Sequence, residues 1–412
     1  MARPKLRVEK LNGGLGRRAP NADMVTGVVM NAVATADMTL GEIYTLNSVD
    51  DIKALGLDEA YDTENTVLVY HRLERLFIHN PSIIVHFMPV AQAVTLQEMA
   101  DVDQNYLAKL IRSKSGAIVQ AFIARNPDGA YVPTIEDGLN DEVVAATQKA
   151  QLLVDANFEK GRFFEVFVEG LNFTGTAAAA LDLKALVPKC PNVSIVIMAD
   201  NDVSKRNAAY AGYAAVEDFA ALVSKAAVSQ NAGEQIEDFS LTNADRKTFI
   251  NAGLSSGLHI DDYTDSDLDV LNGKGYVFAT AVSGIAGYYI VDTNTCTDDE
   301  SDYKFVENNR TINKAIKLAR TKLLPRIKGR LYVDPVTGQL APEDRKDLEA
   351  ATEEALDPML ADRDISGGVD AYIAPDQDVL ATSRLDIELT FIPVAIGREI
   401  KLKIGFDNPL NN

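Results

Sequence analysis

Two aspartates stand where a catalytic pair of carboxylates could lie. The hydrophobic run VSIVIMA ends in Asp200, and Asp202 and Ser204 follow at alternate positions. A buried strand that ends in D-x-D-x-S can present one carboxylate as a nucleophile and the next as a general acid or base, with magnesium bridging them. Two acids after a strand more often form a turn, and we expect a turn here.

The same residues resemble the first motif of haloacid-dehalogenase-type phosphatases. That resemblance implies that Asp200 is phosphorylated and that Asp202 protonates the leaving group. In this chain the motif lies in the middle of the sequence and lacks the usual following Gly-Thr, and no downstream lysine or acidic pair is clearly placed. A phosphatase is therefore kept as an alternative function and not as the main hypothesis.

Other polar residues show no spacing typical of a catalytic or ligand-binding site. The four histidines form no HExxH pair, the N-terminal glycines form no nucleotide-binding loop, and no tryptophan is present. The acidic stretch at residues 261–269 lacks the glycine and glutamate of an EF-hand, so we expect a solvated loop. Cys190 and Cys296 lie far apart in the sequence, which favours free thiols. We predict no catalytic, cofactor-binding or metal-binding residues, and no enzyme.

Composition describes a folded protein with an acidic surface. The chain has 412 residues, 47% hydrophobic and 24% charged, with a net charge of −20. This length suits two or three domains, and the negative charge argues against nucleic-acid binding. The longest apolar runs have the length of strands, so direct membrane insertion is not expected. We see no secretory signal, which indicates folding in a cytoplasm.

Hydrophobic patterning divides the chain into three parts. Residues 1–22 contain a short alternating strand and then a glycine-rich hinge, and a strand of this kind needs another sheet to join. Residues 23–287 alternate strand and helix patterns, including a helix capped by Ser48, which predicts an outer α/β or α+β domain. Residues 288–412 form the last domain.

Segregated charge and strong alternation mark the last domain. From Arg310 to Arg330 there are eight basic residues and no acid, on a helix pattern that Pro325 ends. An acidic helix over residues 343–359 follows, with Pro342 as its first residue. Two alternating strands then cover residues 385–391 and 400–406.

The order and spacing of these stretches resemble contractile phage tail sheath proteins. The resemblance covers most of the chain and is carried by GGLGRRAPNADMVTGVVM, by LNGKGYVFATAVSGIAGYYIVDTNTCTDDE, and by KLLPRIKGRLYVDPVTGQL and SRLDIELTFIPVAIGREIKLKIGF. It is closest to sheaths made of a single protein, from a phage or a phage-derived contractile injection system. Another phage structural component, from a baseplate or capsid, is a further alternative.

The resemblance implies a mixed α+β and α/β, multi-domain fold whose inner domain is built from both chain ends. Terminal strands would be exchanged between subunits of a helical polymer with six-fold rings. The partners would be further copies of the chain, an inner tail tube protein, and baseplate and tail terminator proteins. The subunits would assemble in a bacterial cytoplasm and act in a virion tail or contractile particle.

Residue roles follow from the same resemblance. The expected subunit-interface residues are Lys5, Leu6, Val8, Lys10, Ile400, Leu402, Ile404 and Phe406. The expected hinge residues are Gly13, Gly14, Gly16 and Gly397. The charges expected to face the tube or a neighbouring subunit are Lys314, Lys317, Arg320, Glu343, Asp347, Glu353 and Glu354.

Overall fold

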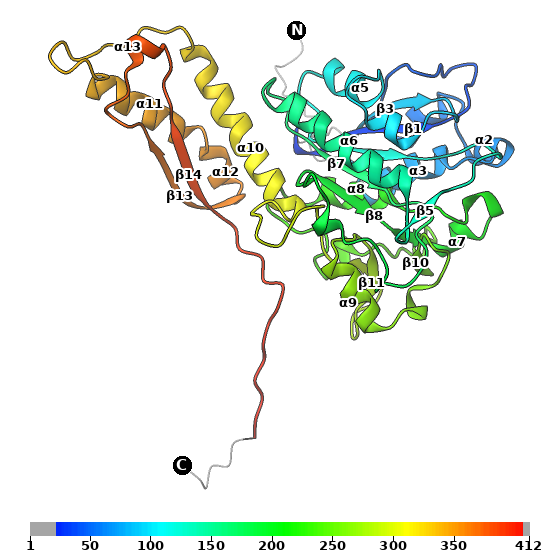
Figure 1. Ribbon diagram of the computed structural model, residues 1–412. Helices are drawn as coiled ribbons and strands as arrows, with labels where there is room; N and C mark the ends of the chain where they lie inside the picture. Colours follow the sequence, from blue (N-terminus) through cyan, green and yellow to red (C-terminus); the bar gives the residue numbers. More distant parts are fainter. Residues whose placement is uncertain (1–21, 407–412) are drawn as a thin grey trace, which may run out of the picture. The chain divides into compact units, whose positions relative to one another are not determined.

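The chain divides into two compact units, Met1–Arg330 and Leu331–Asn412. The computed structural model describes residues 22–406 (Figure 1). The domain boundary predicted at residue 287 lies inside the first unit, which continues through the long helix α10 (Val306–Leu323).

The first unit is built on a six-stranded sheet in the order β2-β3-β1-β4-β7-β8. Strand β2 runs antiparallel to β3, and the other neighbours are parallel. The parallel strands are nearly continuous runs of buried apolar residues, as expected for strands covered on both faces. The bounds are β1 (Val25–Asn31), β2 (Tyr44–Leu46), β3 (Ile84–Val90), β4 (Gln120–Ala124), β7 (Glu165–Glu169) and β8 (Val193–Val196).

Helices cover the two faces of this sheet. On one face, a Cβ added to Gly27 of β1 would lie 3.2 Å from Leu110 of α5, so the missing side chain lets that helix approach closely. On the other face, Phe167 packs against Phe219 of α8, and α3 packs on α8. The helices are α1 (Val49–Lys53), α2 (Glu59–Asn65), α3 (Val69–His79), α4 (Leu96–Ala100), α5 (Leu107–Ser113), α6 (Asp141–Phe158) and α8 (Val216–Lys225).

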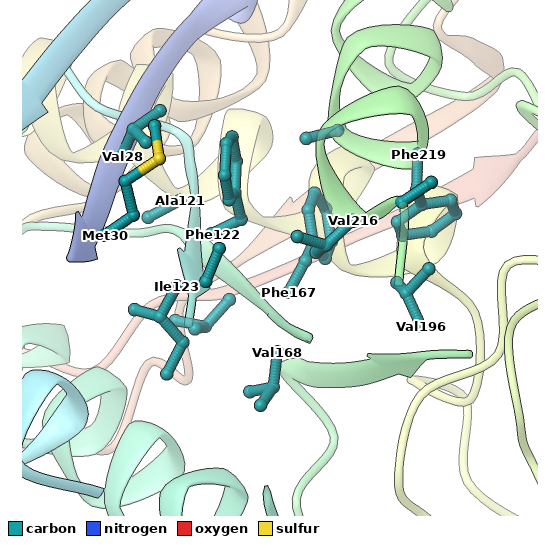
Figure 2. Close-up of a cluster of buried hydrophobic side chains, with 14 of the residues drawn as sticks. Val28, Met30, Ala121, Phe122, Ile123, Phe167, Val168, Val196, Val216 and Phe219 are labelled. Atoms are coloured by element: carbon teal, nitrogen blue, oxygen red, sulfur yellow. The ribbon is translucent and has the colours of Figure 1, made fainter. Parts of the chain in front are cut away.

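A row of apolar side chains in register forms the centre of the core. Val28, Phe122 and Phe167 are paired neighbours on adjacent strands and therefore point to the same face. Figure 2 shows Phe122 and Phe167 in one cluster of buried side chains with Val216 and Phe219 of α8. The rings of Phe167 and Phe219 meet edge to face, with centroids 4.8 Å apart.

Short elements complete the first unit. The acidic stretch predicted as a loop is instead largely helix α9 (Asp265–Gly273), because Thr264 and Asp267 form a capping box and Leu271 is buried. The remaining strands are β5 (Ile135–Glu136), β6 (Leu139–Asn140), β9 (Met198–Asp200), β10 (Ala252–Leu254), β11 (Ala279–Ala281) and β12 (Tyr288–Ile290). The remaining helical segments are α7 (Asn201–Ser204), η1 (Ala22–Met24), η2 (Leu183–Ala185), η3 (Ala208–Tyr210), η4 (Glu237–Phe239), η5 (Ile260–Asp262) and η6 (Leu324–Arg326).

The second unit packs helices on one face of a two-stranded antiparallel sheet. Strands β13 (Ile365–Tyr372) and β14 (Glu388–Pro393) form the sheet, and α11 (Pro342–Glu354) and α12 (Asp357–Ala361) contact β13 (Figure 1). The single acidic helix predicted over residues 343–359 is two helices, because Pro358 cannot continue the first. A short helix, α13 (Val379–Thr382), connects the strands.

Candidate assembly interface

Asp200 has a structural role in the first unit. It is the last residue of β9 and the N-cap of α7, and its side chain accepts a hydrogen bond from the Asp202 N–H. Its other carboxylate oxygen pairs with the Arg75 guanidinium and accepts a hydrogen bond from the Phe249 N–H at 3.0 Å. The side chain is fully buried, and this burial raises its pKa. A nucleophile that must meet a phosphate ester cannot be sealed in this way.

Asp202 does not complete a catalytic pair. Its carboxylate is exposed and accepts hydrogen bonds from the Asn251 amide at 2.8 and 3.0 Å. Within residues 22–406, no cluster of three or more acidic, histidine or cysteine side chains could hold a metal ion. The phosphatase alternative is therefore not supported.

A buried network of charges joins α3 to α8 and to the strand ends. Arg72 pairs with Glu169 at the end of β7 and with Glu217 of α8, the latter at 2.7 Å. His79 Nε2 lies 2.7 Å from an Asp218 carboxylate oxygen. Burial raises the pKa of Glu217 to about 7, and the Arg72 charge opposes that rise. The sequence carried a signal for this network, since Arg72, Arg75 and His79 recur at helical spacing in α3.

Glu165 is a second buried acid, at the start of β7. One carboxyl oxygen accepts hydrogen bonds from the Asn192 and Asn313 amides at 3.0 and 2.9 Å. The other oxygen has no hydrogen-bond partner among residues 22–406. Burial raises the pKa of Glu165 to about 8, although the two amides oppose the change. A protonated Glu165 thus links α10, which carries Asn313, to the central sheet.

A cavity of about 500 Å³, lined by both polar and apolar residues, opens near the carboxyl ends of the parallel strands. Arg72, Arg125 and Glu169 lie in its wall. Both guanidinium groups already face carboxylates, because Arg125 Nε lies 3.3 Å from Glu142 and Arg72 pairs with Glu169. The cavity therefore has no uncompensated positive charge with which to attract an anion.

The basic residues of α10 contact the first unit. Lys314 forms an ion pair with Asp23 at 2.9 Å, and the Lys317 ammonium donates to the Gly116 carbonyl at 3.1 Å. The Arg320 side chain crosses Gly161, where an added Cβ would overlap its guanidinium. The three basic residues among the seven predicted to face a tube or a neighbour thus make contacts inside their own unit.

The acidic residues of α11 lie in two different environments. Glu343, Asp347 and Glu354 are exposed. Glu353 is half-buried, and its carboxylate accepts a hydrogen bond from the Ala371 N–H of β13 at 3.1 Å. Glu349, which the sequence did not single out, accepts one from the Ile373 N–H at 3.0 Å. The spacing of four positions between these two glutamates was the sequence signal that could have placed both on one side of the helix.

The C-terminal alternating segment is exposed on both of its faces. Ile400, Leu402, Ile404 and Phe406 have relative accessibilities of 90%, 76%, 86% and 109%. Within the described residues, positions 394–406 belong to no assigned helix or strand. The predicted strand therefore has no pairing partner in the described part of its own chain.

Several predicted interface and hinge residues can be placed only in part. A Cβ added to Gly397 would meet no atom within 4 Å, so packing does not require glycine there. The N-terminal residues lie outside the described residues, namely Lys5, Leu6, Val8, Lys10, Gly13, Gly14 and Gly16.

The two cysteines meet in the fold although they are distant in the sequence. Cys190 and Cys296 face each other across an isolated antiparallel bridge, and the Cys190 N–H donates to the Cys296 carbonyl at 2.9 Å. Both thiols are buried and unbridged, and burial raises the pKa of each. These are inert core positions in the present arrangement.

Family comparison covers nearly the whole chain. The DUF2586 N-terminal domain matches residues 3–294, and the DUF2586 C-terminal domain matches residues 302–411. The chain belongs to the DUF2586 family. No curated protein matches this DUF2586 member.

Solved structures share the fold of this DUF2586 member along its full length. The helical sheath of the anti-feeding prophage in its contracted state is 14% identical, with a TM-score of 0.61, and 99% of this chain covers 100% of that one. The sheath complex of the PVC extracellular contractile injection system, also contracted, is 13% identical, with a TM-score of 0.59 and coverage of 100% and 99%. A chain of the six-fold symmetrised anti-feeding prophage baseplate is 14% identical, with a TM-score of 0.60 and coverage of 99% and 100%. The mixed α/β fold is thus similar to that of contractile sheath structures.

One membrane-related finding comes from the helices. None of those in residues 22–406 is long and apolar enough to cross a bilayer.

Proposed function

We propose that this chain is the subunit of a contractile tail sheath, which polymerises helically around an inner tube and contracts to drive that tube through a target envelope. The observation that carries the proposal is the fold similarity, which extends over 99% of this chain and 100% of the anti-feeding prophage sheath chain. If the two proteins shared only one domain, the structural alignment would leave part of at least one chain unmatched.

Strand donation is the proposed assembly mechanism. Residues 400–406 present large apolar side chains at alternate positions to solvent. Burying each side chain in a sheet would contribute about 1.5–3 kcal/mol. Every added backbone hydrogen bond would contribute about 1 kcal/mol net. A segment of this kind is an aggregation hazard unless a defined partner covers it. The N-terminal arm around Leu6 and Val8 is proposed as the second donated strand.

Domain roles follow the same proposal. Residues 1–22 form the donating arm, residues 23–287 the outer domain, and residues 288–412, together with the arm, the inner domain. Glycines in the arm and Gly397 act as hinges, so that subunits rotate on contraction while the joint persists. On contraction, sheath subunits must also change from one packing arrangement to another, and an interface with two stable arrangements permits this.

Charge contacts to the tube belong to the same proposal. Glu343, Asp347 and Glu354 of α11 are exposed and are proposed to make these contacts, and Lys314 and Lys317 of α10 also contact their own unit. The other proposed partners are baseplate and tail terminator proteins. Assembly would take place in a bacterial cytoplasm, and the product would be a virion tail or an extracellular contractile particle.

Negative-stain electron microscopy of the purified chain tests this function. We expect hollow, striated tubes of uniform width for the full chain and for a chain that ends at Phe406. A chain that ends at Gly397, or one that lacks residues 1–10, should keep the thermal transition of the first unit and form no tubes. Uniform tubes from either shortened chain would refute strand donation. Closed rings or single particles from the full chain under all salt conditions would instead favour a baseplate or capsid component.

A further inference from the structure

The outer edge of β13 is closed by two carboxylates of the same chain. β13 pairs with β14 on one side, where Asp370 lies opposite Thr390 and Tyr372 lies opposite Glu388. In an antiparallel strand alternate N–H groups point to opposite edges. The Ala371 and Ile373 N–H groups are thus left on the far edge.

Helix α11 supplies acceptors for both of these N–H groups. The Ala371 N–H donates to Glu353 at 3.1 Å, and the Ile373 N–H donates to Glu349 at 3.0 Å. The two glutamates are four positions apart, so both project from one side of the helix. Hydrogen bonds to charged acceptors are stronger than neutral ones, and a free edge is otherwise a template for another strand. The carboxylates therefore hold positions that the carbonyl groups of an added strand would occupy.

Residues 400–406 of a second copy have the pattern that suits this edge. Ala371 and Ile373 are buried, whereas Asp370 and Tyr372 on alternate positions are exposed. An added strand that turns Ile400, Leu402 and Ile404 toward the helix-covered face would continue that apolar face.

Charge is also complementary in this arrangement. Turning the apolar residues toward the helices places Lys401 and Lys403 on the open face, the face that carries Asp370. Opposite charges on neighbouring strands stabilise a sheet when they share a face.

We propose that Glu349 and Glu353 form a removable cap on the acceptor edge of β13, and that residues 400–406 of a second copy displace it during assembly. This inference rests on the proposed sheath function, because it assumes that copies join by strand addition. The cap keeps the edge of a free subunit satisfied, so that joining becomes favourable only when a donated strand supplies replacement carbonyl groups and apolar contacts. Glu353, expected from the sequence to face a tube or neighbour, thus regulates the joint from inside its own unit.

Hydrogen–deuterium exchange on the dilute full chain tests the cap, with fragmentation that resolves single amides. The probe is a synthetic peptide of residues 398–406. In the Glu349→Ala/Glu353→Ala variant, we expect the Ala371 and Ile373 amides to exchange about tenfold faster per lost bond. The peptide should then protect these amides at a concentration at least about tenfold lower than in the wild-type chain. Glu343→Ala removes a charge from the same helix without touching the edge, and it should behave as wild type.

A second variant separates the loss of the cap from a loss of folding. Glu349→Gln/Glu353→Gln keeps the side-chain size and a weaker acceptor, so its peptide affinity should lie between those of the wild type and the alanine variant. Equal peptide affinity in all four proteins would overturn the cap. Protection of the outer amides of β14 in place of Ala371 and Ile373 would overturn the choice of edge. Tube formation is scored separately by electron microscopy. A wild-type chain that forms no tubes but shows the expected peptide response would refute the sheath proposal and still support the cap.

Discussion

Glu165→Gln is expected to stabilise the first unit in a strongly pH-dependent way. The folded-state pKa of Glu165 is raised from 4.5 to about 8. Between these pH values the carboxyl group is protonated in the folded protein and ionised in the unfolded chain. The stability from the protonated form is therefore fully present below about pH 4.5 and is lost as the pH rises to about 8.

The size of the effect follows from the distance between the two pKa values. Each pH unit above 4.5 costs about 1.4 kcal/mol, so the penalty at pH 7 is about 3 kcal/mol. Glutamine avoids this cost because it never ionises, and its oxygen can still accept from Asn192 and Asn313. For a unit of roughly 300 residues the gain corresponds to a rise of about 5 °C in Tm at pH 7.

Calorimetry of the dilute chain at pH 5, 7 and 8 measures this difference. The gap between variant and wild type should be below about 1 kcal/mol at pH 5 and largest, at about 5 kcal/mol, at pH 8. Glu136→Gln changes an exposed glutamate in the same unit and should give no such trend. A constant gap at all three pH values would refute a buried, protonated Glu165.

Three further substitutions test the core and one cap. Arg72→Met leaves Glu169 and Glu217 buried without their cation and should cost about 3–5 kcal/mol in unfolding free energy. A loss below about 1 kcal/mol in denaturant titrations would show that water reaches these carboxylates. Phe167→Ala removes the ring that meets Phe219 and should cost about 3–5 kcal/mol, seen as a lower Tm. Thr264→Ala removes the N-cap of α9 and should cost about 1 kcal/mol, with Thr264→Ser close to neutral by the same assay.

Local signals in the sequence predicted several element boundaries correctly. Ser48 accepts a hydrogen bond from the Asp51 N–H as the N-cap of α1, and Pro342 is the first residue of α11. Pro325 lies just beyond the end of α10. These predictions were possible because a cap or a proline acts on backbone groups within a few residues.

One helix was missed because the composition of its residues suggested a loop. The aspartates of residues 261–269 suggested a solvated loop, yet the Thr264 capping box and the burial of Leu271 produce α9. Composition describes how polar a segment is, whereas one capping box and one buried leucine decide its conformation.

The candidate site could be predicted only where its pattern is local. Alternation predicts a strand over residues 400–406, since period two would place Ile400, Leu402 and Ile404 on one face. It does not identify the edge that this strand joins. The pairing of Glu349 and Glu353 with β13 depends on how α11 lies against the sheet, and the helix pattern does not encode that placement.

The sequence by itself determined most of the element kinds, their order, and the alternating strand that forms β14 in the last domain. Only the tertiary structure decided what the buried acids do. Asp200 sits beside Arg75, which is 125 positions away in the chain, and this contact turns a motif that suggested catalysis into part of the core. Hydrophobic periodicity is a property of neighbouring residues, but the environment of a carboxylate is set by side chains that folding brings in from distant segments.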